Sequence, residues 1–345
     1  MQFRNKSDLN GIKKILIIQF RPFGDVLLAT SYLKALQERF PDARIDFLVK
    51  KPYHEVLAQH PYLSHVMSFE QTRGLNYVIS RIKIFAMIRR RQYDLVIDQQ
   101  HGTGSAQVVF TSGARYKLGW SHGIKAWLYN LKAVRGPARY NAIRNFDMLV
   151  PLGITDQNPD FYVHIDPKSE DFVVLWLREQ QVDPTELILM SPGSPRAKKK
   201  WHPMHFAKLT DLILSQTKMK VVLLQGPNEF EDCCQVISGS RYKPLLGPKT
   251  TLNQVAALLK QCRMLVCNDG GLNHLSVALE VPSLAIFGNT PPKIWSPQGY
   301  IPHHHHLHNP DWKRHSDNGF GISSDEAFQK ILEIMTDLNI TPYRS

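Results

Sequence analysis

The segment Leu265–Pro292 holds the residues whose types and spacing are best suited to chemistry. An apolar strand, Met264 to Cys267, is followed by Asn268-Asp269-Gly270-Gly271 and then by the pattern of a helix. The unpaired N–H groups and the dipole at a helix N-terminus favour an anion such as phosphate, and glycines let a ligand oxygen approach the backbone. We therefore expect a phosphorylated ligand near Gly270 and His274. The alternative is a plain strand–helix corner, with Asp269 as the helix cap and His274 in the core.

Asp25 is a second candidate, because it follows the first apolar strand in the segment Arg21-Pro22-Phe23-Gly24-Asp25. In parallel sheets the ligand lies at the carboxyl ends of the strands, so a carboxylate there could serve as a general base. The alternative role is that of a helix N-cap. Position alone leaves both roles open.

A basic loop follows the strand Leu187–Ser191. It runs from Pro192 through Ser194 to Trp201 and carries Arg196, Lys198, Lys199 and Lys200. A diphosphate needs such cations where no metal is present. The alternative is a solvated basic loop.

Glu229 follows Gly226-Pro227-Asn228 at the end of another strand. An acidic side chain there suits a ribose diol, as in other nucleotide sites, and the alternative is an ordinary acid in the first turn of a helix. The loop His101-Gly102-Thr103-Gly104 lacks the third glycine of a dinucleotide fingerprint. Asp98, which precedes that loop, is expected to be structural, and His101 could face an acceptor.

Metal binding is not expected. His303–His306 and His308 resemble a metal tract, but consecutive residues on a loop cannot all face one ion. The four cysteines form no CxxC pair, so neither a zinc framework nor a disulfide scaffold is indicated.

Alternating strands and helices must position these residues, in two successive blocks. The first block is expected to contain strands at Lys14–Phe20, Ile45–Val49, His65–Phe69 and Leu95–Asp98, and helices at Asp25–Phe40, Tyr53–Gln59 and Asn76–Arg91. In the last helix Val78, Ile79, Ile82, Phe85, Ala86 and Ile88 are expected to point inward. After a linker at Pro159–Pro167, the second block repeats the pattern up to a closing helix at Asp325–Leu338. This order predicts two parallel-sheet domains, with the ligand in the cleft between them.

Length and charge narrow the function. A chain of 345 residues fits two α/β domains, and no apolar run is long enough to span a bilayer. The N-terminus has no apolar signal core, so we expect a cytoplasmic protein. Residues 1–168 hold 24 Lys and Arg against 13 Asp and Glu, a net charge of +11 out of the formal +12. An anionic partner for this half could be a nucleic acid, an acidic lipid headgroup or an anionic glycan.

Taken in order, these segments resemble glycosyltransferase family 9, the ADP-heptose:lipopolysaccharide heptosyltransferases. The resemblance covers most of the chain. The matching motifs are Gly24-Asp25 with Val26-Leu27-Leu28, Phe40-Pro41-Asp42-Ala43 with Ile45–Val49, Pro192-Gly193 through Lys199-Lys200-Trp201, Gly226-Pro227-Asn228-Glu229, Asp269-Gly270-Gly271-Leu272-Asn273-His274-Leu275, and Phe287-Gly288-Asn289-Thr290-Pro291. The chain departs from the family pattern at Ala29-Thr30-Ser31, where Thr-Thr-Pro is usual, at Gly270, where Thr or Ser is usual, and at the histidine tract after Pro297.

The resemblance implies a GT-B fold, in which two Rossmann-like parallel-sheet domains face a central cleft. Residues 1–165 would form the acceptor-binding domain, residues 166–324 the nucleotide-sugar-binding domain, and residues 325–345 a closing helix. The implied reaction is inverting, metal-independent and cofactor-free transfer of a heptose from an ADP-sugar, expected to be ADP-heptose. The implied acceptor is the lipopolysaccharide inner core or lipid A–Kdo. The protein would contact the inner membrane peripherally at its cytoplasmic face and would bind no nucleic acid.

By the same resemblance Asp25 is the catalytic base, and Lys199 binds the diphosphate and stabilises its departure. The expected donor-binding residues are Gly24, Ser194, Lys199, Glu229, Asp269, Gly270, Gly271 and His274. The expected acceptor-binding residues are Arg21, His101, Arg89, Arg90 and Arg91. Two alternatives stay open: a GT-B transferase or epimerase that uses another nucleotide sugar, such as a UDP-sugar, and a non-catalytic protein that binds an anionic glycan or a nucleic acid through its basic half.

Overall fold

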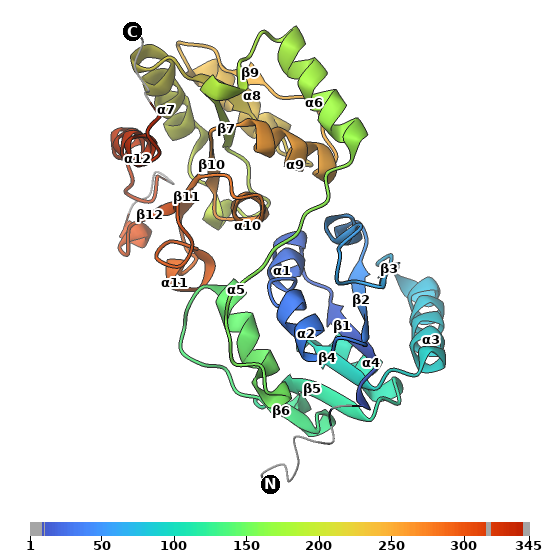
Figure 1. Ribbon diagram of the computed structural model, residues 1–345. Coiled ribbons are helices and arrows are strands. Elements are labelled where there is room, and N and C mark those ends of the chain that lie inside the picture. The colour runs from blue at the N-terminus through green and yellow to red at the C-terminus, as the bar shows by residue number, and fades with distance from the viewer. Residues whose placement is uncertain (1–8, 10, 315–318, 341–345) are drawn as a thin grey trace. The chain divides into compact units, whose positions relative to one another are not determined.

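The computed structural model describes residue 9 and residues 11–314 and 319–340. The chain divides into two units, Met1–His164 and Ile165–Ser345. Within the described residues each unit contains a parallel sheet of six strands, in the order β3-β2-β1-β4-β5-β6 in the first unit and β12-β11-β10-β7-β8-β9 in the second (Figure 1). The α/β class that the sequence predicts is confirmed.

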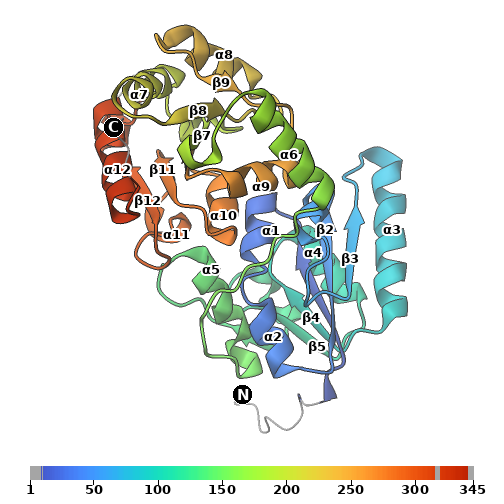
Figure 2. The same cartoon turned by 45° about the horizontal axis from the view of Figure 1, so that its top comes forward.

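The first sheet consists of β1 (Lys14–Gln19), β2 (Arg44–Lys50), β3 (His65–Phe69), β4 (Leu95–Asp98), β5 (Tyr116–Trp120) and β6 (Leu131–Ala133). Its helices are α1 (Phe23–Leu28), α2 (Leu33–Arg39), η2 (Tyr53–Leu57), α3 (Gly74–Arg91), α4 (Thr103–Thr111), η3 (Ile124–Leu128), α5 (Asn141–Arg144) and η4 (Asn145–Leu152), where η denotes a 3₁₀ helix. Helices cover both faces of this sheet, with α1 and α2 on one face and α3 and α4 on the other (Figures 1 and 2).

The second sheet consists of β7 (Leu187–Ser191), β8 (Lys220–Leu223), β9 (Leu245–Leu246), β10 (Met264–Asn268), β11 (Ser283–Phe287) and β12 (His304–His308). Its helices are α6 (Pro167–Glu179), η5 (Pro184–Glu186), η6 (Ala197–Lys199), α7 (Pro203–Gln216), α8 (Phe230–Gly239), α9 (Leu252–Gln261), α10 (Gly271–Ala278), α11 (Pro292–Trp295), η7 (Trp312–Arg314) and α12 (Ser324–Asp337). In the second unit α7 packs against both α8 and α12, and α6 packs against α9.

Continuous apolar runs form the central strands, because both faces of a parallel sheet are covered. Residues 15–18 of β1 are fully buried, and so are residues 264–266 of β10. The core of the second unit joins Ile188, Val266 and Ile286 of its sheet to Phe206 of α7 and Ile331 of α12. In the part of the chain that the structure describes, no helix combines the length and the apolar character needed to cross a bilayer.

The single helix expected at Asp25–Phe40 is wrong, because the chain forms α1 and α2 with a break after Leu28. The Thr30 hydroxyl donates to the Leu27 carbonyl at 2.7 Å, and the Asn145 side chain donates to the Leu28 carbonyl at 2.7 Å. These side chains take carbonyls that a continuous helix would have used, and such competition is characteristic of Ser and Thr.

The inward face expected for the helix Asn76–Arg91 is also wrong in part. Val78, Ile79 and Ile82 are exposed on α3, whereas Arg81, Ile84 and Ile88 are buried. The Arg81 guanidinium donates to the Gly104 carbonyl at 2.5 Å and to the Gln107 side chain at 3.1 Å, both on α4. A polar partner on the neighbouring helix therefore decides which face turns inward.

The histidine tract was expected to be a loop, and this is wrong. Residues His304–His308 form β12, which pairs in parallel with β11 from Ser283↔His304 to Phe287↔His308. Side chains alternate along a strand, and His304 and His306 make hydrogen bonds of 2.9 Å to the Ser283 and Ser296 hydroxyls. The short strands β5, β6 and β9 were not anticipated either.

Candidate active site

The loops at the carboxyl ends of β7 and β10 are joined by one amide side chain in the second unit. Asn268, the last residue of β10, accepts from the Trp201 N–H at 2.9 Å and donates to the Pro192 carbonyl at 2.8 Å. Trp201 itself is fully buried and anchors the end of the basic loop. Asn268 was not among the expected site residues, although it directly precedes Asp269-Gly270-Gly271. It holds the basic loop beside that segment.

Lys199 and Asp269 form an ion pair, with 2.5 Å between Lys199 Nζ and Asp269 Oδ2. The Asp269 side chain is only 2% exposed. The N-cap of α10 is Gly270, and no side chain caps this helix, so the alternative role of Asp269 as a cap is wrong. The carboxylate fixes the position of Lys199.

His274 lies one helical turn beyond Gly270 and is buried. Burial lowers its pKa to about 4. The negative charge of Asp269 partly opposes this shift, and the positive charge of Lys199 adds to it. The imidazole is therefore neutral at pH 7. Its ring centroid lies 6.0 Å from that of Trp295, so the histidine backs the wall of the pocket described next.

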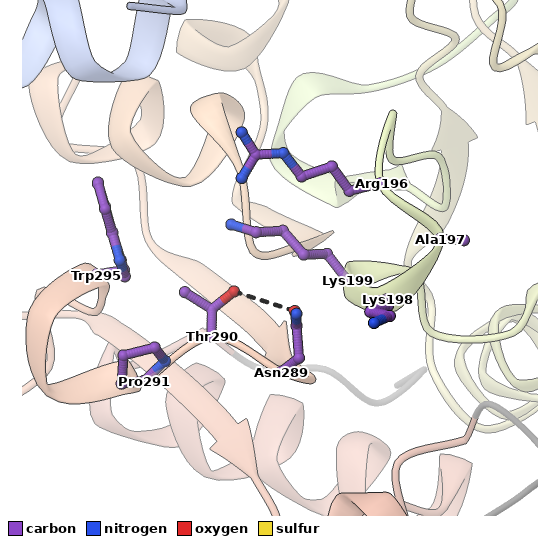
Figure 3. A pocket seen from close by; sticks show the side chains of 8 residues that line it. All are labelled: Arg196, Ala197, Lys198, Lys199, Asn289, Thr290, Pro291 and Trp295. Carbon is purple, nitrogen blue, oxygen red and sulfur yellow. Dashed lines mark hydrogen bonds between the residues drawn. The ribbon is translucent and has the colours of Figure 1, made fainter. Parts of the chain in front are cut away.

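A pocket of about 430 Å³ lies beside this ion pair. It is lined by Arg196, Ala197, Lys198, Lys199, Asn289, Thr290, Pro291 and Trp295. Figure 3 shows the Arg196 and Lys199 side chains running side by side toward the space in front of Trp295. Cationic side chains and an aromatic ring thus line the same pocket, an arrangement that suits a phosphorylated ligand with a ring. Sequence reasoning did not name Trp295, Asn289, Thr290 or Pro291 as site residues, although the last three belong to the motif Phe287-Gly288-Asn289-Thr290-Pro291.

Gly270 is not required by the backbone. Its φ of −178° is extended, and a Cβ at this position would come no closer than 3.8 Å to any neighbour, the Asn268 carbonyl oxygen. The family's usual Thr or Ser would fit here. Gly271 is the first residue of α10. In the basic loop, the Ser194 hydroxyl accepts a weak hydrogen bond from the Arg196 backbone N–H at 3.4 Å.

Glu229 lies against two glycines. A Cβ at Gly193 or at Gly226 would come within 2.4 Å of its carboxyl group, and the Gly226 N–H donates to Glu229 Oε2 at 3.2 Å. Burial raises the pKa of this carboxyl, and the Gly226 N–H opposes the shift. The two glycines let the carboxylate lie at the ends of β7 and β8. Glu229 occupies the N-cap position of α8 without a capping hydrogen bond, so the reading as a first-turn acid is wrong.

In the first unit, Asp25 is the third residue of α1, at the carboxyl end of β1. The N-cap is Pro22 and no side chain caps the helix, so Asp25 does not act as the cap. Arg21 Nη1 lies 3.5 Å from Asp25 Oδ1, and the preceding Gly24 is buried. A partly exposed carboxylate beside a cation at a strand end has the position and chemistry of a general base.

Further basic side chains lie at this edge of the first sheet. The Arg135 guanidinium lies 4.6 Å from the Trp120 ring centroid, and its pKa is lowered by burial and by the positive charges of Arg144 and Arg21. Arg135 and Arg144 were not expected from the sequence. The feature that could have identified them is their position in the chain after β6, which ends at the same edge of the sheet as Arg21.

His101 lies at this edge as well, 4.9 Å from the His122 ring. The backbone N–H of His101 donates to one carboxylate oxygen of the buried Asp98 at 2.9 Å, and the Tyr129 hydroxyl donates to the other oxygen at 2.7 Å. Burial raises the pKa of Asp98 and lowers that of His101. Asp98 is thus a structural group that holds the loop carrying His101.

The structure does not bring Arg89, Arg90 and Arg91 together with Asp25. The Lys14 ammonium, at the start of β1, donates to the Arg91 carbonyl, whereas Asp25 follows the end of the same strand. Arg91 is also paired with the buried Asp46 at 3.0 Å, and the Arg89 guanidinium lies over Gly113. The three arginines therefore lie at the opposite edge of the sheet. Among the described residues no group of His, Cys, Asp or Glu side chains is arranged to hold a metal ion.

Comparison with known proteins agrees with this architecture. The family model of glycosyltransferase family 9 (heptosyltransferase) matches residues 81–317. Lipopolysaccharide heptosyltransferase 3 of Escherichia coli K12 is 27% identical over 291 residues, which cover 80% of this chain and 83% of the relative. The crystal structure of a family 9 glycosyl transferase from Veillonella parvula has a TM-score of 0.84 at 20% identity and covers 94% of this chain and 97% of its own. E. coli ADP-heptose lps heptosyltransferase II has a TM-score of 0.75 at 18% identity, covering 94% and 99%. The structural likenesses confirm the expected GT-B fold.

Proposed function

The chain belongs to glycosyltransferase family 9, and on that basis we propose that it transfers a heptose from ADP-heptose to the inner core of lipopolysaccharide, with inversion at the anomeric carbon and without a metal ion. Membership of the family makes the protein a glycosyltransferase. The sugar and the acceptor come from the names of relatives, one a lipopolysaccharide heptosyltransferase and another an ADP-heptose lps heptosyltransferase. The second unit would hold the donor, and the first unit would hold the inner-core or lipid A–Kdo acceptor.

The observation that carries the donor assignment is the basic pocket at Arg196, Lys198 and Lys199. Asp269 positions Lys199, and the ammonium keeps further N–H donors for a diphosphate. Arg196 and Lys198 have no ion pair with any other described residue, so their charge is free to meet a diphosphate. An arginine can do so with two parallel hydrogen bonds.

Glu229 is the proposed ribose ligand. Its carboxylate can accept hydrogen bonds from two neighbouring hydroxyls, and Gly193 and Gly226 leave room for it at the strand ends. Trp295 offers a flat apolar surface in the same pocket as the cations.

In the proposed reaction Asp25 removes the proton from an acceptor hydroxyl while that oxygen attacks the anomeric carbon of the heptose. The bond between the anomeric carbon and the diphosphate oxygen breaks, and ADP leaves with the bonding electron pair. Arg196, Lys198 and Lys199 stabilise the charge that builds on the diphosphate, as a metal ion does in other enzymes. Attack opposite the leaving group gives inversion.

Turnover by the purified protein tests this proposal. ADP-heptose and lipopolysaccharide truncated before the heptose region should give ADP and a product heavier by one heptose, measured by mass spectrometry, with unchanged rate in EDTA. The linkage of the product, read by NMR, should be inverted relative to the donor. Transfer from UDP-sugars alone would support the rival donor class, and nucleotide-sugar binding without any turnover would support a non-catalytic role.

A further inference from the structure

Helix α3 presents an apolar stripe outward. Leu75, Val78, Ile79 and Ile82 follow the i, i+3, i+4, i+7 spacing of one helical face, and all four are exposed, Leu75 by 75% and Ile82 by 59%. The opposite side of α3 packs inward through Arg81, Ile84 and Ile88. A stripe of this kind normally faces a core, so its exposure here calls for a partner.

Two neighbouring elements also carry exposed apolar side chains. Helix α3 contacts α4, and α4 contacts η3. Phe110 of α4 and Trp127 of η3 are 63% and 70% exposed and form an edge-to-face pair with ring centroids 6.5 Å apart. Ile124 of η3 is 92% exposed. We call the exposed apolar residues Leu75, Val78, Ile79, Ile82, Phe110, Ile124 and Trp127 the α3–η3 surface.

The charges on these elements have one sign. Helix α3 contains no Asp or Glu, and neither does the segment from Gln99 to Phe146. The exposed basic residues of these segments include Lys83, Arg90, Arg115 and Lys132. Lys and Arg can lay their stems along an apolar surface while the charged ends reach outward.

This combination identifies the partner by its chemistry. An anionic phospholipid bilayer offers acyl chains to the apolar side chains and phosphate groups to the surrounding cations. A second copy that used the same face would bring like charges together, which opposes association. A tryptophan and a phenylalanine at the surface also suit the interface between headgroups and acyl chains.

We propose that the α3–η3 surface docks the protein onto an anionic lipid bilayer. This inference deepens the proposed function, because a lipid-linked acceptor would be reached at such a surface. It assigns specific side chains to the expected peripheral membrane contact. The residues of this surface are distinct from those that line the donor pocket.

Vesicles without lipopolysaccharide and without nucleotide sugar test the surface separately from the reaction. The protein should cosediment with vesicles of phosphatidylethanolamine and phosphatidylglycerol about tenfold or more better than with phosphatidylcholine vesicles, and less at high salt. The triple variant Ile82→Ser, Phe110→Ser, Trp127→Ser should lose about tenfold or more of this binding. Leu175→Ser is the matched control, because Leu175 is equally exposed on α6 of the second unit, and it should bind like the parent.

Two further measurements keep the proposal open to refutation. The fluorescence difference between the parent and Trp127→Phe should shift to shorter wavelength on addition of anionic vesicles. Thermal unfolding and turnover of a deacylated, water-soluble acceptor should be unchanged in the triple variant, which shows that it folds. Equal vesicle binding by a folded triple variant would overturn the proposal, and a concentration-dependent dimer that the triple variant loses would assign the surface to a second copy. Vesicle binding without heptose transfer would leave the surface assignment standing and reject the proposed reaction.

Discussion

At the scale of single residues, Asp25 contributes a negative charge to the first turn of α1 but does not cap the helix. Pro22 is the N-cap of α1, and Asp25 lies in the first turn with Arg21 beside it. An Asn at this position keeps the shape and loses the charge. The favourable interaction of a first-turn acid with the helix dipole is small, about 0.3–1 kcal/mol.

We therefore predict that Asp25→Asn lowers kcat by roughly 10²-fold or more with little change in stability or ADP affinity, because a positioned base contributes about 10²–10⁴-fold. Steady-state kinetics, thermal unfolding and calorimetry with ADP check the three parts. Normal turnover by Asp25→Asn would remove the general-base assignment.

Lys199 allows a second test, on the donor side. Lys199→Ala should lower the affinity for ADP by about tenfold and the affinity for AMP much less, because the proposed contact is with the diphosphate. The same change leaves the buried Asp269 carboxylate unpaired, and breaking a buried pair costs on the order of 3–5 kcal/mol.

The double variant Lys199→Ala, Asp269→Asn is the control for stability. It should recover much of the lost unfolding free energy in urea titrations while ADP binding stays weak. Calorimetry in which ADP and AMP lose affinity equally would show that Lys199 does not contact the diphosphate.

At the scale of elements, β12 shows how a polar segment becomes part of a sheet. Its backbone pairs with β11, and the buried His304 bonds to Ser283 on the neighbouring strand. Burial lowers the pKa of His304 to about 4, with smaller contributions from His303 and His305. Burial likewise lowers the pKa of His306 to about 4.

This depressed pKa makes the second unit sensitive to acid. Between the folded value of about 4 and the unfolded value of about 6.5, the unfolded chain binds a proton that the native chain does not. The contribution of His304 to the free energy of unfolding is therefore fully present above about pH 6.5 and is lost as the pH falls toward 4. At about pH 5 the loss should be on the order of 2 kcal/mol.

His304→Asn should reduce this pH dependence, since an amide can still bond to Ser283 but does not titrate. Urea unfolding at about pH 7.5 and about pH 5 measures the difference. His303→Asn is the adjacent control, because His303 is exposed and its φ of +64° suits Asn. An identical pH dependence in His304→Asn and the parent would contradict the role of burial.

At the scale of the whole molecule, positive charge is concentrated in the N-terminal half, at +11 for residues 1–168. Such an excess attracts an anionic partner over distances of about 8–10 Å at physiological ionic strength. Arg21, Arg135 and Arg144 lie at the edge of the sheet that carries Asp25, and Arg91 lies at the other edge. Two kinds of positive charge are thus expected: one that contacts the acceptor and one that only attracts it.

We predict that raising the salt concentration raises the apparent KM for the phosphorylated acceptor and changes the KM for the donor little. At low salt Arg135→Gln should raise the acceptor KM by about tenfold, as expected for a lost charge-assisted hydrogen bond, and the exposed Arg90→Gln should raise it less than twofold. An acceptor KM indifferent to salt and to Arg135→Gln would show that the basic half serves another partner.

Much of this architecture could be predicted from residue patterns. Apolar runs such as those of β4 and β7 begin and end where expected, because their residues are buried on both faces whatever surrounds them. Gly226 and Glu229, and Asp269 beside Gly270, also follow strands as expected. Chain order alone brings such residues to one edge of a parallel sheet.

What the sequence by itself determined, then, was the fold class, the order of strands and helices, and the edges at which the reactive residues lie. Only the tertiary structure decided that Asp269 pairs with Lys199, that Asn268 joins two loops, that Arg81 turns inward and leaves Ile82 exposed, and that His304 enters a sheet. The physical reason is that hydrophobic periodicity is a local property, whereas the partner of a polar or charged side chain is supplied by segments far away in the chain.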